Sequence, residues 1–151
     1  MKNRTLTISL PALIITAALL MSCGNERNTA HANTGIDKLG SYITVEQLHK
    51  VVESGKDIYL VDVRTFREFL HKRLPFADDL IPYDSLQYLA DRLPKDKNSE
   101  IFLFCRTGRR SRIAFNTLKE MGYHNLHNVR GGIVAWEEAG YETISGPMEV
   151  K

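Results

Sequence analysis

Short apolar runs alternate with amphipathic stretches along the chain from residue 41 onward. Because these runs are wholly or largely apolar, they predict buried strands at residues 42–43, 58–63, 101–104 and 126–129, with a weaker one at 77–81. The stretches between them carry apolar residues at helical spacing and predict helices that begin near residues 44, 65, 84, 111 and 131. Strands that alternate with helices in this way predict an α/β sandwich around a central, mostly parallel sheet.

Local signals mark where three of these helices begin. Residues 44–47 (Thr-Val-Glu-Gln) and 65–68 (Thr-Phe-Arg-Glu) each match a capping box, in which two side chains bind each other's backbone N–H groups. Asp84 is the candidate N-cap of a third helix, which would end at Pro94. We expect the three helices to present apolar stripes made of Val45, Leu48 and Val52, of Phe66 and Phe69, and of Leu86, Leu89 and Leu93.

The N-terminal 22 residues have the composition of a bacterial export signal. Lys2 and Arg4 precede residues 6–21, which are apolar apart from two threonines, one serine and one proline. That run is shorter than the roughly 20 residues needed to span a bilayer, so it predicts a cleaved signal peptide at residues 1–22. The following sequence, Leu20-Met21-Ser22-Cys23, resembles the lipobox of bacterial lipoproteins, in which Cys23 would carry the lipid. The alternative is an ordinary secretory signal with an incidental cysteine.

The predicted mature chain has two parts. Residues 23–40 contain the lipidated cysteine and a segment that has no apolar periodicity and is typical of a flexible tether. Residues 41–151 form the predicted domain. The expected location is the bacterial cell envelope, with the domain outside the cytoplasm and anchored to a membrane by its lipid. The sequence does not decide between the inner and the outer membrane.

Charge is balanced over the predicted mature chain. Residues 1–22 contain Lys2 and Arg4 and no acidic residue, so their removal lowers the basic count from 20 to 18, which equals the acidic count. No overall basicity therefore indicates binding to nucleic acid. Arginines instead gather locally around Cys105, and this arrangement favours a small anionic substrate.

The segment Cys105-Arg106-Thr107-Gly108-Arg109-Arg110 joins an apolar strand to a predicted helix. Backbone N–H groups and a helix N-terminus can converge on the sulfur there, which favours the nucleophilic thiolate. Lowering a cysteine pKa from about 8.5 to about 6.5 needs roughly 2.7 kcal/mol. A helix terminus contributes about 2 kcal/mol at most, so N–H bonds to the sulfur and nearby guanidinium groups are expected to add the rest.

Cys105 is the only thiol left in the chain if Cys23 carries lipid. A structural disulfide then has no partner, although the protein is expected in a compartment where disulfides form. The alternative is a buried, inert cysteine that packs as a small apolar residue. The glycine and the arginines beside Cys105 argue against it, because apolar packing does not require them.

Four groups of residues resemble the rhodanese (sulfurtransferase) family in order and spacing. They are Asp62-Val63-Arg64 with Glu68-Phe69, Leu74-Pro75 with Ile81-Pro82, Cys105-Arg106-Thr107-Gly108-Arg109-Arg110-Ser111, and Gly131-Gly132-Ile133-Val134-Ala135-Trp136 with Gly140. The resemblance covers residues 41–142 and implies a rhodanese-like three-layer sandwich with a central, mostly parallel five-stranded sheet flanked by helices. The chain departs from the family at Arg73-Leu74-Pro75-Phe76-Ala77, where His-Ile-Pro-Gly-Ala is usual, so the nearby wall of the site is expected to differ.

The resemblance also implies roles for individual residues. Cys105 would accept a sulfane sulfur and become a persulfide, cradled by the backbone N–H groups of the loop. The expected substrate-binding residues are Arg106, Thr107, Gly108, Arg109 and Arg110, of which Arg106 and Arg110 would hold an anionic donor such as thiosulfate. Asp62 and Arg64 are expected to form a structural ion pair near the loop, the alternative being direct contact with substrate. We expect no cofactor and no metal, since His124 and His127 have no carboxylate or cysteine at ligand spacing.

The leading hypothesis is a sulfurtransferase that passes sulfur from Cys105 to a thiol or to cyanide. A carrier or rhodanese-like binding module without turnover would keep the same loop and is the alternative. A phosphatase or an arsenate reductase is more remote. Phosphatases related to this fold use the spacing Cys-x5-Arg, whereas here the fifth residue after Cys105 is Arg110 and the sixth is Ser111.

Overall fold

The computed structural model describes residues 39–148. The predicted signal peptide (1–22), the lipid attachment site Cys23 and the tether up to residue 38 lie outside the described residues. Among residues 39–148, no helix is both long enough and apolar enough to cross a membrane.

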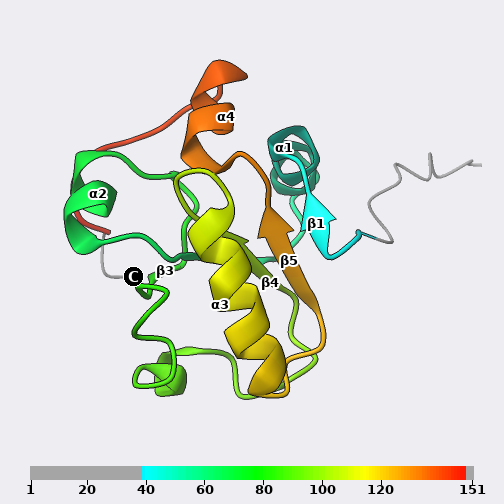
Figure 1. The fold of residues 1–151 in the computed structure, drawn as a ribbon. Coiled ribbons are helices and arrows are strands. Elements are labelled where there is room, and N and C mark those ends of the chain that lie inside the picture. Colours follow the sequence, from blue (N-terminus) through cyan, green and yellow to red (C-terminus); the bar gives the residue numbers. More distant parts are fainter. Residues whose placement is uncertain (1–38, 149–151) are drawn as a thin grey trace, which may run out of the picture. The chain divides into compact units, whose positions relative to one another are not determined.

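A five-stranded parallel sheet forms the centre of the domain. Its strands lie in the order β1-β5-β4-β2-β3, which places β4 in the middle (Figure 1). Their bounds are Tyr42–Ile43 for β1, Tyr59–Asp62 for β2, Asp79–Leu80 for β3, Ile101–Phe104 for β4 and Leu126–Val129 for β5. The predicted α/β sandwich with a mostly parallel sheet is therefore confirmed.

Helices cover both faces of this sheet. Their bounds are Val45–Glu53 for α1, Phe66–His71 for α2, Arg109–Glu120 for α3 and Gly132–Glu138 for α4. Helix α3 packs on one face, in front of the sheet in Figure 1, and α1 and α4 contribute to the core on the other face. Strand β4 is wholly apolar because both of its faces are buried. Ile101 and Leu103 join the core under α3, whereas Phe102 and Phe104 join the core under α1 and α4.

Both capping boxes form as the sequence predicts. The Thr44 and Thr65 side chains each accept a hydrogen bond from the backbone N–H three residues on, and the Gln47 and Glu68 side chains accept one from the backbone N–H groups of Thr44 and Thr65. The stripes differ in detail. Helix α1 buries Val51 rather than Val52 beside Val45 and Leu48, and α2 buries Phe69 but leaves Phe66 63% exposed. The spacing of three places both rings on one side of α2, but only Phe69, one turn further into the helix, reaches the core.

The helix predicted from Asp84 is wrong. The segment from residue 83 to residue 93 consists mainly of turns, and its only regular piece is the short 3₁₀ helix η1 at Ala90–Arg92. Most of its backbone hydrogen bonds join residues three apart, such as the one from Ser85 N–H to the Pro82 carbonyl. Leu86 and Leu93 are nevertheless buried, because successive turns bring them to the core as well as a helix would.

Candidate active site

Cys105 directly follows β4 at the carboxyl end of the sheet. Its neighbour across the sheet is the end of β2, where Asp62 pairs in register with Phe104. The whole cysteine residue is only 1% exposed. The middle strand of the sheet therefore delivers the thiol to the edge at which parallel α/β sheets form their sites.

Glycines at two positions let the loop close around the sulfur. Gly108 has φ = +89° and caps the start of α3, and its N–H donates to Cys105 Sγ over 3.1 Å. Gly132, with φ = +57°, lies so close to the loop that an added Cβ would be 2.2 Å from the Cys105 carbonyl oxygen. A side chain at either place would strain the backbone or push the loop away.

Ser111 and Asn128 form a buried polar pair beside the sulfur. The Ser111 hydroxyl lies 3.3 Å from Cys105 Sγ and 2.6 Å from Asn128 Oδ1, so its single proton is shared between two acceptors. The Asn128 amide donates in turn to the Gly108 carbonyl over 3.3 Å. The sequence alone did not indicate that these two residues belong to the site. A polar asparagine inside the buried strand 126–129 was the signal available.

Hydrogen bonds hold the pKa of the Cys105 thiol below its ordinary value. Burial raises that pKa, but the Ser111 hydroxyl and the backbone N–H groups of Ser111, Thr107 and Gly108 together outweigh it. The sequence led us to expect guanidinium groups to contribute as well. The donors in direct contact with the sulfur are a hydroxyl and backbone N–H groups, and the guanidinium of Arg110 adds an attraction by charge.

Arg110 pairs with Glu68 of α2. Its two terminal nitrogens donate to the two carboxylate oxygens over 2.8 and 2.6 Å, in a bidentate arrangement. The hydrogen bond from Arg110 is the main reason that the pKa of Glu68 falls to about 2. The same bond is the largest cause that raises the pKa of Arg110, and the charge of Cys105 adds to it. Arg110, expected to hold an anionic donor, thus already has a carboxylate partner.

A small polar cavity of about 350 Å³, which we call the mouth, lies beside the Cys105 loop. The residues that line it are Glu68, Arg106, Thr107, Arg109 and Arg110. Arg106, Thr107 and Arg109 are exposed there, so the structure brings the predicted substrate-binding side chains of the loop to one opening. Gly108 is the exception, because it is buried and contributes its N–H group.

Asp62 and Arg64 form the ion pair expected from the sequence. Arg64 donates to the carboxylate from Nε and Nη2 at distances between 2.5 and 2.9 Å, and Nη2 also binds the Lys72 carbonyl. The two residues are 1% and 3% exposed, which leaves a substrate no access to them. Burial raises the pKa of Asp62, and the bonds from Arg64 oppose that rise. The pair joins the end of β2 to the end of α2, and so positions the helix that carries Glu68.

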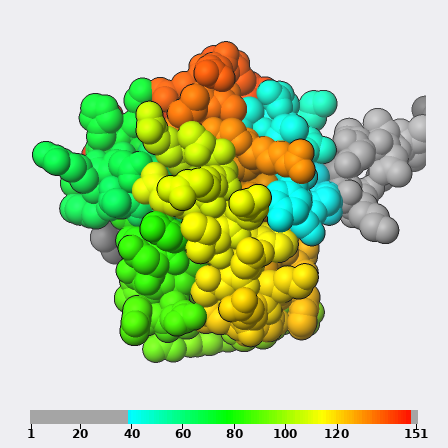
Figure 2. Space-filling model, in the orientation of Figure 1, coloured from blue at the N-terminus to red at the C-terminus, as the bar shows by residue number. Residues whose placement is uncertain are grey.

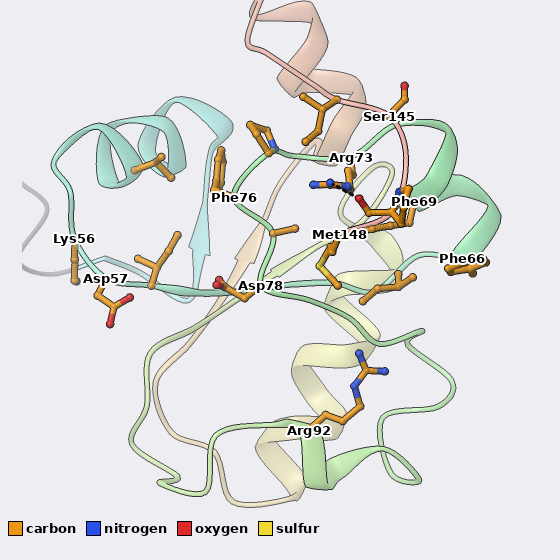
Figure 3. A pocket seen from close by; sticks show the side chains of 17 residues that line it. Lys56, Asp57, Phe66, Phe69, Arg73, Phe76, Asp78, Arg92, Ser145 and Met148 are labelled. Atoms are coloured by element: carbon orange, nitrogen blue, oxygen red, sulfur yellow. Dashed lines mark hydrogen bonds between the residues drawn. The ribbon is translucent and has the colours of Figure 1, made fainter. Parts of the chain in front are cut away.

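Arg73, in the segment that departs from the family pattern, holds the C-terminal segment of the domain. Its guanidinium donates to the carbonyls of Gly146 and Pro147, and its backbone pairs with Ile144. Figure 3 shows Arg73 among the residues that line a cavity of about 1170 Å³, which includes Met148 and no residue of the Cys105 loop. The altered segment therefore lines a cavity that is separate from the Cys105 loop.

The histidines considered in the sequence lie either buried in the sheet or at the surface. His127 lies in β5 and contacts the Gly40 carbonyl and the Glu100 carboxylate. The spacing in the sequence did not suggest this carboxylate partner. His71 and His124 are exposed. Within residues 39–148, no three His, Cys, Asp or Glu side chains come together as a metal site would require.

Comparison with known proteins places this loop in a family. A model of the rhodanese-like domain matches residues 44–139. A "Sulfurtransferase" of Allochromatium vinosum is 33% identical over 103 residues, covering 68% of this chain and 94% of that protein. The "Putative sulfur carrier protein YrkF" of Bacillus subtilis is 31% identical, and the match covers 62% of this chain but 49% of the relative. A rhodanese-like domain protein from Staphylococcus aureus superposes with a TM-score of 0.59 at 28% identity, covering 74% and 99% of the two chains. The chain belongs to the rhodanese-like domain family.

Proposed function

We propose that this protein is a sulfurtransferase that moves a sulfane sulfur from an anionic donor such as thiosulfate to a thiol or cyanide. The observation that carries the proposal is the environment of Cys105, a thiol of lowered pKa whose sulfur accepts hydrogen bonds from Gly108 and Ser111. Relatives named as a sulfurtransferase and as a putative sulfur carrier support sulfur transfer in general.

The first half-reaction loads the cysteine. The Cys105 thiolate attacks the outer sulfur of thiosulfate, a new S–S bond forms, and the old S–S bond breaks with its electron pair leaving on sulfite. The persulfide that results carries negative charge on its outer sulfur. N–H groups of the loop and the Ser111 hydroxyl are the donors available to stabilise that charge.

The second half-reaction empties the cysteine. A thiolate or cyanide attacks the outer sulfur, and the electron pair of the persulfide bond returns to Cys105 Sγ. No general base is needed in either step if the thiolate is already formed. This agrees with the composition of the loop, which contains no histidine.

Two features argue against the phosphatase alternative. The loop places Arg110 five residues after the cysteine rather than six, which gives a smaller cradle. Arg110 is also held by Glu68, so it is not free to bind a phosphate oxygen.

The test is mass spectrometry of the purified full-length chain before and after incubation with thiosulfate. We expect a gain of about 32 Da on Cys105, removed by cyanide or a thiol, and no gain in Cys105→Ser. Steady-state turnover with several acceptors then separates an enzyme from a carrier, which would load once and release slowly. Release of phosphate from an aryl phosphate, with no sulfur adduct from any sulfane donor, would show that the proposal is wrong.

We propose in addition that Cys23 carries a lipid that holds the domain at a membrane of the bacterial cell envelope. The lipobox-like sequence Leu20-Met21-Ser22-Cys23 and the polar segment behind it support this. A soluble donor and acceptor would then meet the enzyme outside the cytoplasm.

A further inference from the structure

Arg109, Arg112 and Arg130 line a second cavity beside the Cys105 loop, which we call the arginine pocket. Its volume is about 490 Å³, and its other lining residues are Tyr42, Thr107, Gly108 and Asn128. No acidic residue lines it. Within residues 39–148, none of its three guanidinium groups forms an ion pair, in contrast to Arg110.

Three elements bring the pocket together. Arg109 and Arg112 lie in the first turn of α3, where a spacing of three residues puts their side chains on one face. Arg130 follows β5, and Tyr42 comes from β1, which pairs with β5. Tyr42 stacks on Phe115 with ring centroids 5.7 Å apart, and the Arg130 guanidinium lies 5.3 Å from the Tyr42 ring. On the face shown in Figure 2, the yellow atoms of α3 border orange atoms and the cyan atoms of the β1 region.

This arrangement gathers three positive charges around one cavity. Like charges close together repel one another, and two of these arginines also sit at the positive end of a helix. Arg130 packs on the Tyr42 ring, but no carboxylate of the described residues forms an ion pair with any of the three arginines. A ligand with several negative charges would complement the charge of these three arginines.

The pocket adjoins the mouth of the active site. Both cavities are lined by Thr107 and Arg109, whereas Glu68 and Arg110 line only the mouth and Gly108 lines only the arginine pocket. A donor as small as thiosulfate needs the mouth alone. An occupant of both cavities has to extend past Thr107 and Arg109, which requires a larger molecule.

We propose that the arginine pocket binds a carboxylate-rich segment of a protein that accepts sulfur from Cys105. The inference rests on the proposed function. The acceptor's thiolate attacks the outer sulfur of the Cys105 persulfide, the S–S bond breaks, and its electron pair returns to Cys105, so that the acceptor leaves as a persulfide. The arginines take no part in these bonds. They raise the rate of encounter and orient the acceptor by charge complementarity.

The test uses the full-length chain in detergent solution and two synthetic acceptor peptides. Each peptide carries one cysteine, followed in one by a run of glutamates and in the other by glutamines. We expect the thiosulfate-loaded wild type to transfer sulfur about tenfold faster to the glutamate peptide at low salt, and at equal rates at high salt. The double variant Arg112→Gln/Arg130→Gln should lose this preference and still load with sulfur on Cys105.

The matched control is Arg67→Gln/Lys119→Gln, which removes the same charge from exposed positions outside the pocket. It should keep the preference. Equal rates for the two peptides in the wild type, or an equal loss in the control, would overturn the inference. So would arginine-dependent binding to phosphatidylglycerol vesicles without any peptide preference, because the surface would then be a membrane contact.

Two readouts separate this inference from the proposed function. Failure of Cys105 to gain sulfur contradicts the sulfurtransferase itself. Fluorescence anisotropy of the labelled glutamate peptide with Cys105→Ser protein reports on the pocket without any chemistry. Binding that is about tenfold weaker in the variant with both pocket arginines replaced supports the pocket, and unchanged binding contradicts it.

Discussion

At the scale of single residues, the reactivity of Cys105 depends on how well its hydrogen-bond donors offset burial. The sulfur is almost inaccessible, and burial alone would keep the thiol protonated. The Ser111 hydroxyl is the largest of the effects that lower its pKa. Asn128 competes for the same proton, so the pair can adjust as the sulfur gains or loses charge.

Replacing Ser111 by alanine should therefore raise the pKa of Cys105, since the lost hydrogen bond to a charged group contributes about 1.5–3 kcal/mol. The measurement is the rate of iodoacetamide labelling as a function of pH. Thr117→Ala is the control, because it removes a hydroxyl from the exposed side of the same helix, where it binds only the Ile113 carbonyl. An unchanged midpoint in Ser111→Ala would contradict the role given to the hydroxyl.

The Glu68–Arg110 pair should make stability depend on acid pH. The pKa of Glu68 is about 2 in the folded protein, well below its value of about 4.3 in an unfolded chain. Its contribution to stability is therefore complete above about pH 4.3 and fades as the pH falls towards 2. Wild type should exceed Glu68→Gln in its free energy of unfolding at pH 7, and urea titrations at falling pH should show the difference shrink. Glutamine keeps the capping box, so a constant difference would contradict this explanation.

The same substitution should change how the enzyme uses its donor. With Glu68 neutral, Arg110 is free to bind an anion at the mouth, and the KM for thiosulfate should fall by about tenfold. Steady-state kinetics with Glu120→Gln as the control measures this, since Glu120 is exposed at the far end of α3. A higher KM in Glu68→Gln would mean that the ion pair itself binds the donor in its present form.

At the scale of elements, the start of α4 supports the Cys105 loop. Ile133 N–H donates to the Cys105 carbonyl, and Val134 N–H donates to the Arg106 carbonyl. Only a glycine at position 132 permits this approach, because a Cβ would overlap backbone atoms of both loop residues. The Gly131-Gly132 pair at the start of α4 thus supports the Cys105 loop from a neighbouring element.

Gly132→Ala should lower the free energy of unfolding by about 1–3 kcal/mol more than Gly140→Ala, as expected for overpacking. The two glycines share a positive φ, of +57° and +77°, but an added Cβ meets nothing within 4 Å at Gly140. The control therefore isolates the collision from the backbone strain. Gly132→Ala should also slow sulfur loading of Cys105 in the mass assay. Equal stability and equal loading in both variants would show that α4 does not support the loop.

The elements also show where sequence-based prediction succeeds. The capping boxes at 44–47 and 65–68 were predicted correctly, because each depends on residues three apart in the chain. The helix expected from Asp84 failed, because leucines at helical spacing are equally compatible with turns that bury them one by one. The spacing of the leucines does not distinguish a helix from a series of turns, because either structure can bury their side chains in the core.

At the scale of the whole molecule, the lipid anchor proposed at Cys23 predicts that the protein fractionates with membranes. Cys23→Ala should move it to the soluble fraction, whereas Cys105→Ser should leave it membrane-bound. Mass spectrometry of the native protein should reveal several acyl chains, because one chain anchors a protein only marginally. A wild-type protein that is wholly soluble and cleaved at another position would contradict the anchor.

The sequence by itself determined the sheet's strands and the place of Cys105, since an apolar strand followed by a cysteine and a glycine-containing turn is a local pattern. It also determined the family, through motifs that keep their order along the chain. Only the tertiary structure decided the partners around the sulfur. Arg110 meets Glu68 across 42 residues of sequence, and Ser111 meets Asn128 across 17. Packing of β5, α2 and α3 selects such pairs, and no spacing in the sequence specifies which polar groups a fold will bring within hydrogen-bond distance.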